Sequence, residues 1–68
     1  MRKVIQVTVA GRIKYHASHN PNNGAITLSE DINEASVFKS EWDMTFVPRI
    51  KEHIKREYPT AEIIIVNG

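Results

Sequence analysis

The sequence predicts one small α+β domain, in which one main helix packs on one face of a mostly antiparallel sheet. Three observations predict it: two alternating segments around a turn near the N-terminus, an amphipathic helix pattern beginning at Pro48, and a β-branched run in the last residues. Strands that come before a single helix favour a sheet covered on one side. The 68 residues leave room for one core, so we expect a single domain over residues 1–68.

The first two strands are expected to form a β-hairpin. Lys3 to Val9 alternates as a half-buried strand does, Ala10-Gly11 makes a short turn, and Arg12 to Ser18 continues the alternation. The more apolar parity of the second strand is expected to face the core, and it comprises Ile13, Tyr15 and Ala17. The basic parity is then expected to face outward, and it comprises Arg12, Lys14 and His16.

The middle of the chain predicts shorter elements. His19 to Gly24 is rich in turn-forming residues, and Ala25 to Ser29 is a short third strand with its two large apolar residues on one face. Asp31 is expected to cap a single helical turn, and Phe38 to anchor the extended piece that follows. This part of the sheet is therefore expected to be small.

Proline divides the helical region. Ser40 fits the N-cap of a helix that begins at Glu41, but a continuous helix would place Pro48 in its interior, where the ring clashes with the preceding turn. We expect a kink or break between Met44 and Pro48, with Thr45 as a second cap. Trp42 and Phe46 are still expected to face the core.

The main helix runs from Pro48 to Tyr58. Its apolar residues recur at steps of three and four and so share one face. Pro59 ends it, and Glu62 to Val66 then predicts a strand. Because this strand has four apolar residues in a row, we expect it to lie centrally or against a partner. The helix face comprises Val47, Ile50, Ile54 and Tyr58.

Composition limits the classes of protein. The chain has no cysteine, which excludes disulfides, and its longest apolar run, Ile63 to Val66, is far too short to span a bilayer. The N-terminus lacks the pattern of a signal peptide. We therefore expect a cytoplasmic protein with no membrane partner.

The sequence indicates no enzyme, no metal site and no cofactor. The three histidines do not show a metal-binding spacing, and the paired acids are explained by turns and caps. No phosphate-cradling glycine loop or nucleophile motif occurs.

Basic residues raise nucleic-acid binding as an alternative function, because residues 1–29 carry four bases and no acid. Against this reading, the aromatic residues that would stack on bases are expected in the core. The candidate contacts for nucleic acid or an acidic partner are Arg12, Lys14, His16, Arg49, Lys51, Lys55 and Arg56.

Two segments carry a resemblance to a known group of proteins. They are Asp31 to Ser40, with its acidic-x-x-x-Ala-x-x-Phe pattern, and Tyr58 to Ile65, which follows a basic helix. The chain resembles small proteins of uncharacterised function that phages and prophages of Gram-positive bacteria encode. The resemblance covers the C-terminal half and implies a setting, a bacterial or phage cytoplasm, with no catalytic residue to carry over.

The function expected from the sequence is a non-enzymatic protein interaction module that associates with itself. One helix covers only one face of a sheet, and Glu62 marks its own parity on the last strand as uncovered. If this strand lies beside the first one, residues of the same parity are the candidate contacts of a homodimer. They are Val4, Ile64 and Val66.

Overall fold

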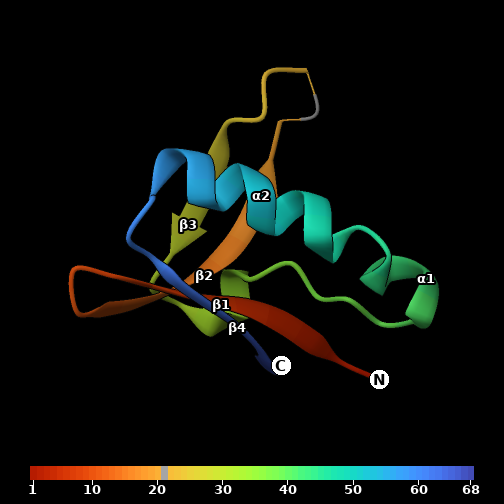
Figure 1. Ribbon diagram of the computed structural model, residues 1–68. Coiled ribbons are helices and arrows are strands. Elements are labelled where there is room, and N and C mark those ends of the chain that lie inside the picture. The colour runs from red at the N-terminus through yellow and green to blue at the C-terminus, as the bar shows by residue number, and fades with distance from the viewer. Residues whose placement is uncertain (21) are drawn as a thin grey trace.

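The computed structural model describes residues 1–20 and 22–68 and confirms the α+β fold. Four antiparallel strands form one sheet in the order β3-β2-β1-β4, and the longest helix, α2, crosses one face of it (Figure 1). Pro21, in the predicted loop, lies outside the described residues. The strands are β1 (Lys3–Val9), β2 (Arg12–His19), β3 (Ile26–Ser29) and β4 (Glu62–Asn67). The helices are the 3₁₀ turn η1 (Ile32–Glu34), α1 (Glu41–Met44) and α2 (Val47–Glu57).

The turn between β1 and β2 determines which side chains of β2 face the helix. Ala10 and Gly11 both have positive φ, 52° and 78°, as a two-residue type I′ turn requires. Such a turn pairs Val9 with Arg12, and the register continues with Val7 opposite Lys14. Residues paired across antiparallel strands point to the same face, so the Arg12 parity of β2 lies on the helix face.

The prediction for the two faces of β2 was therefore wrong. The alternation is present, but its phase is opposite to the expected one. Arg12, Lys14 and His16 lie on the helix face, whereas Ile13 and Tyr15 lie on the other, which we call the outer face. A register shift between His16 and Ser18 then leads into the pairing with β3.

β4 pairs with β1, which meets the condition on which the choice of dimer contacts depended, with Val4 opposite Val66 and Ile5 opposite Ile65. It is an edge strand of the sheet, however, so of the two places expected for it the central one is wrong, while a place against a partner stays a prediction. The apolar run is accommodated because the odd-numbered side chains face α2 while Ile64, on the outer face, stays half exposed.

The helical region breaks where the proline pattern predicts. Ser40 caps α1 by accepting a hydrogen bond from the Asp43 N–H, and α2 begins with Pro48 in its first turn, where a missing N–H costs nothing. Thr45 does not cap α2, because its hydroxyl donates to the Trp42 carbonyl at the end of α1.

The expected burial of the two aromatic residues was wrong. Trp42 is 72% exposed and Phe46 47% exposed. In one continuous helix they would share a face with Ile50 and Ile54, but the break between α1 and α2 ends that periodicity.

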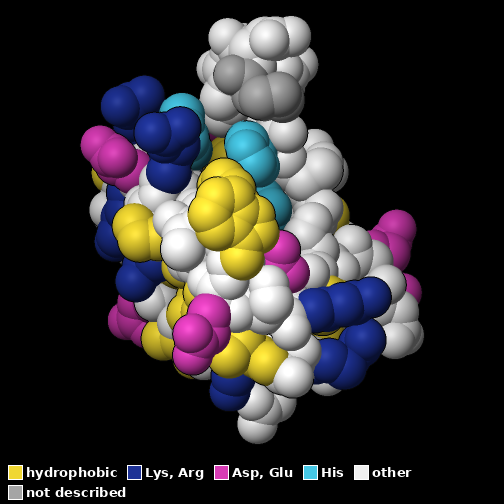
Figure 2. Space-filling view, turned by 90° about the vertical axis from the view of Figure 1, so that its right-hand side faces the viewer, with side chains coloured by type: hydrophobic (Ala, Val, Ile, Leu, Met, Phe, Trp, Pro, Cys, Tyr) yellow, Lys and Arg dark blue, Asp and Glu magenta, His cyan; other side chains and the backbone are white. Residues whose placement is uncertain are grey.

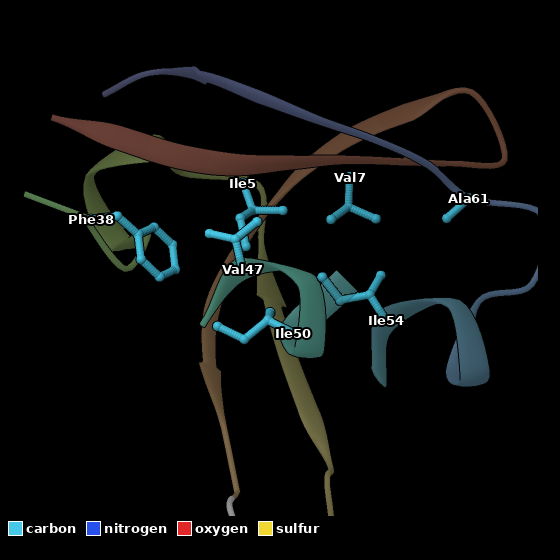
Figure 3. Packing of buried hydrophobic residues seen from close by; sticks show 7 residues of the cluster. All are labelled: Ile5, Val7, Phe38, Val47, Ile50, Ile54 and Ala61. Atoms are coloured by element: carbon cyan, nitrogen blue, oxygen red, sulfur yellow. The ribbon is translucent and has the colours of Figure 1, made fainter. Parts of the chain in front are cut away.

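The core lies between the sheet and α2 (Figure 3). Ile5 and Val7 of β1 face Ile50 and Ile54 of α2, and the end of the cluster beside Val47 is closed by the predicted anchor Phe38. Two backbone hydrogen bonds join Phe38 to Lys3, at 2.9 and 2.8 Å, and so continue the pairing along β1 beyond its last pair with β2. Asp31 caps η1 as predicted, its carboxylate accepting from the Asn33 N–H at 2.9 Å. The buried cluster comprises Ile5, Val7, Phe38, Val47, Ile50, Ile54 and Ala61.

Candidate interaction surfaces

The outer face of the sheet combines apolar and polar side chains. Ile13 on β2 and Ile64 on β4 are 52% and 51% exposed, and they lie on either side of the central strand β1. The positions between them carry the polar side chains of Gln6 and Thr8, which pair with residues of both neighbouring strands. Two large exposed aliphatic side chains therefore stand on the face that α2 does not cover.

The three candidate dimer contacts share this face but differ in accessibility. Ile64 is exposed and Val66 half-buried. Val4 is fully buried within one chain, so its assignment as a dimer contact was wrong. The backbone of Gly68 packs against it, since a Cβ on Gly68 would come within 2.7 Å of Val4 Cγ1. Ile13, which sequence reasoning had placed in the core, is accessible on the outer face, where Val4 is not.

The basic candidates do not form one surface. The three on β2 face the helix side, and each is in a different situation: Arg12 is exposed and bonds Glu30 at 3.2 Å, Lys14 is half-buried, and His16 is buried. The expected basic outer face is therefore absent from the described residues. The hairpin turn contained the missing signal, because a two-residue loop puts Val9 and Arg12 on the same face.

The four basic residues of α2 also differ in their surroundings. Arg56 is 4.0 Å from Glu52, and the Lys55 ammonium donates to the carbonyl of Ala61 just before β4. Arg49 is exposed and Lys51 half-buried. Only part of the candidate set is thus available for a second molecule.

The structure brings together the three histidines that the sequence separates. The ring of His16 on β2 lies 5.7 Å from that of His19, which stacks at 6.4 Å on His53 of α2. His16 is 2% exposed, and neither of its ring nitrogens has a hydrogen-bond partner among the described residues. Desolvation by burial lowers the pKa of His16 from 6.5 to about 4, with a smaller contribution from the charge of His19.

This histidine row does not form a metal centre. Within residues 1–20 and 22–68, no group of three His, Asp or Glu side chains is arranged to hold a metal ion. Several of the acidic residues have structural partners. Asp31 caps η1, Asp43 accepts from the Lys39 N–H at 2.8 Å, and Glu34 accepts from the Ser29 hydroxyl at 2.7 Å.

A groove that sequence reasoning missed runs between α2 and β4. It is open and encloses about 640 Å³. Its helix wall is one stripe of α2, at steps of three and four residues, and its other wall is the free edge of the sheet. The lining residues are Pro48, Lys51, Glu52, Lys55, Ala61, Glu62, Ile63 and Ile64.

A further exposed apolar feature lies on the side of α1. Trp42 and Phe46 meet edge to face, their ring centroids 5.7 Å apart. Figure 2, which looks onto this side of the molecule, shows hydrophobic side chains at the surface close to histidine side chains. The pair lies outside the sheet and so provides a control for experiments on the outer face.

Comparison with known proteins does not assign the chain to a family, because no family model, curated protein or solved structure matches it. No helix in the described part of the chain is long and apolar enough to cross a membrane.

Proposed function

We propose that the protein is a non-enzymatic interaction module that forms a homodimer, in the cytoplasm of a bacterium or of a phage-infected cell. One observation carries the dimer: Ile13 and Ile64 are about half exposed on the sheet face opposite α2. Exposed aliphatic side chains on a sheet face are a common basis of protein association. The structural partners of Asp31, Asp43 and Glu34 support a role without catalysis.

The dimer places the two outer faces against each other around a twofold axis. Stacked sheets lie about 10 Å apart, a distance that the side chains of Ile13, Ile64 and Val66 fill from both sides. A twofold axis makes every contact reciprocal, so that Arg2 of one chain faces Glu62 of the other at the rim. Both residues are exposed on the outer-face parity.

The interface is small, so the dimer is weak. A stable interface takes about 800 Å² from each partner, whereas the whole chain exposes 4586 Å² and the apolar part of the outer face is only a fraction of it. We therefore expect an equilibrium of monomer and dimer that shifts with concentration, with dimer present at about 0.5 mM protein.

Sedimentation equilibrium of Ile13→Lys and Ile64→Lys tests the proposal. Each variant should be a folded monomer at concentrations where the parent dimerises, because the lysine would bring a charge into the interface. Trp42→Lys is the matched control, since it removes a more exposed apolar side chain away from the sheet, and it should dimerise like the parent.

Three results would overturn the proposal. One is a parent that stays monomeric at about 0.5 mM. Another is loss of the dimer in Trp42→Lys alone. The third is salt-sensitive binding of duplex or single-stranded DNA at about 0.1 mM protein, which would favour the nucleic-acid alternative.

A further inference from the structure

The far ends of β2 and β3 leave the main sheet as a two-stranded arm. β1 pairs with β2 only as far as Tyr15, so among the described residues the part of β2 beyond it has β3 as its strand neighbour. A register shift between His16 and Ser18 marks the base of the arm. Figure 1 shows the two strand ends passing beside α2 and projecting beyond it. We call residues 16–20 and 22–28 the distal arm.

The distal arm contacts α2 through histidine side chains. His19 of β2 stacks on His53 of α2 with ring centroids 6.4 Å apart, and the ring of His16 lies 5.7 Å from that of His19. The backbone of Gly24 lies on the His53 ring, because a Cβ at Gly24 would come within 2.7 Å of His53 Nδ1. Both strands of the arm are thus held near one side chain of α2.

The inner end of the histidine row is buried. His16 is 2% exposed and stacks on Phe38, and neither of its ring nitrogens has a hydrogen-bond partner in residues 1–20 and 22–68. The Ser36 N–H donates to the His16 carbonyl at 2.9 Å and so holds the base of the arm in place. A charge on an unpartnered buried ring is costly, so His16 takes up a proton readily only when its ring reaches water.

The surroundings of the row offer little compensation for positive charge. The ion pairs within the described residues are Arg12–Glu30 and Arg56–Glu52, and neither includes a histidine. β3 and the described loop residues before it carry no charged side chain. Bases outnumber acids among the charged residues of the neighbouring elements. They are Lys14 on β2, Arg49, Arg56 and Glu57 one turn from His53 on α2, Glu34 on η1, and Lys39 beside Phe38.

We propose that the histidine row is an acid-sensitive latch between the distal arm and α2. The neutral rings hold the arm against the helix, and their protonation releases the arm while β1, β4 and α2 stay folded. Release uncovers Ile26 and Leu28, which pack against the buried cluster. The latch does not depend on the proposed dimer, because Ile13 and Ile64 lie outside the arm.

The linkage of proton binding to release gives the size of the effect. The pKa of His16 is about 4 while its ring is buried, and it returns to its ordinary value of 6.5 when release brings the ring into water. The released arm therefore binds more protons below pH 6.5. The equilibrium constant for opening should rise about twentyfold between pH 7 and pH 5.

Native-state amide hydrogen exchange on the whole chain, at low urea concentrations, tests the latch. The Ser36 amide, which is bonded to His16, should exchange through an opening that hardly depends on urea, because release exposes little surface. After correction for the intrinsic exchange rate, its opening constant should show the twentyfold rise in acid. The Ile54 amide, in the interior of α2, should exchange through global unfolding with a strong urea dependence.

Replacing His16 tests which group is responsible. His16→Leu does not titrate, so the rise at Ser36 between pH 7 and pH 5 should fall to less than about twofold. His16→Phe, which keeps a ring next to Phe38, takes its place if the leucine variant does not fold. Glu34→Gln is the matched control. It removes another titratable group near the base of the arm, where Glu34 accepts from the Ser29 hydroxyl, and it should keep the full rise.

Gly24→Ala tests the contact with α2. At pH 7 it should raise the opening constant of Ser36 by about fivefold or more, because either the arm or the His53 ring must move to accept the Cβ, and both movements disrupt the row. Gly11→Ala is the control for backbone strain. Its φ of 78° is close to the 73° of Gly24, but nothing lies within 4 Å of its added Cβ, so Ser36 should be unaffected.

Five results would each overturn the proposal. They are an opening constant at Ser36 that is the same at pH 7 and pH 5, a rise that persists in the His16 variants, a rise that is lost in Glu34→Gln, equal urea dependence of the Ser36 and Ile54 amides, and equal effects of Gly24→Ala and Gly11→Ala.

Discussion

The two faces of the sheet give the same side chain very different surroundings. Ile5 on the helix face is fully buried, whereas Ile13 and Ile64 on the outer face are about half exposed. All three lie on strands of the same sheet. The difference arises from which parity α2 covers, and the turn at Ala10-Gly11 sets that parity for β2. An alternating pattern thus shows that the faces differ, while the geometry of the connections decides which of them is covered.

Replacing one isoleucine on each side of the sheet by alanine tests the difference between the covered and the outer face most directly. Ile54→Ala should lower the free energy of unfolding by about 2–5 kcal/mol, because it leaves a cavity beneath α2, where Ile54 is fully buried. Ile64→Ala should cost less than about 1 kcal/mol, since much of that side chain is already in water. Urea denaturation at low protein concentration measures both. Equal losses would mean that α2 does not define the covered face.

The helix face also holds His16, a titratable group without a hydrogen-bond partner in residues 1–20 and 22–68, which makes this face sensitive to acid. The pKa of His16 is lowered to about 4 in the folded chain, so between 6.5 and 4 the unfolded chain binds more protons. The contribution of neutral His16 to the free energy of unfolding is therefore fully present above about pH 6.5, and it is lost as the pH falls toward 4. Between pH 7 and pH 5 the loss should be about 2 kcal/mol.

His16→Leu provides the control for that prediction. Leucine keeps an apolar group of similar size next to Phe38 and does not titrate, so the slope of stability between pH 7 and pH 5 should become much smaller. Thermal melts across this range measure the slope. A parent and a variant with the same slope would show that His16 is protonated as easily in the folded chain as in the unfolded one.

The smallest predicted effect concerns the turn that sets the faces. Ala10 has φ 52°, a conformation that costs an L-residue with a Cβ about 1–2 kcal/mol but that asparagine adopts more readily. Ala10→Asn should therefore raise the melting temperature by about 4 °C. Gly11→Ala should lower it, although nothing lies within 4 Å of the added Cβ, because φ at Gly11 is 78°. A lower melting temperature for Ala10→Asn would contradict the type I′ turn.

Much of the fold could be predicted from local patterns, and the rest depends on geometry that such patterns do not express. The strands, the cap at Asp31, the Phe38 anchor and the break before Pro48 follow from alternation, hydroxyl or carboxylate caps and the chemistry of proline. The phase of β2 does not, because it depends on how the chain turns. Trp42 lost its predicted place in the core for a similar reason, since a change of helix direction outweighs periodicity.

The candidate surfaces were predictable only in part. Ile64 was assigned correctly to an accessible position, because its neighbour Glu62 marks that parity. The histidine row and the groove were not predicted, since each joins elements that are distant in the sequence. The place of β4 at an edge of the sheet could be found only from the strand order, because its apolar run had indicated either a central place or a partner.

The two-residue length of the hairpin loop has a consequence for how this chain tolerates insertions. If a residue added between Val9 and Arg12 shifted the register by one while the turn kept two residues, β2 would present its opposite side chains to α2, so that Ile13 and Tyr15 would replace Lys14 and His16 beneath the helix. A three-residue loop that keeps Val9 opposite Arg12 would leave the faces as they are. Both phases offer a partly apolar strand surface, which means that the register set at the turn selects between two sheets that the same strand sequence supports.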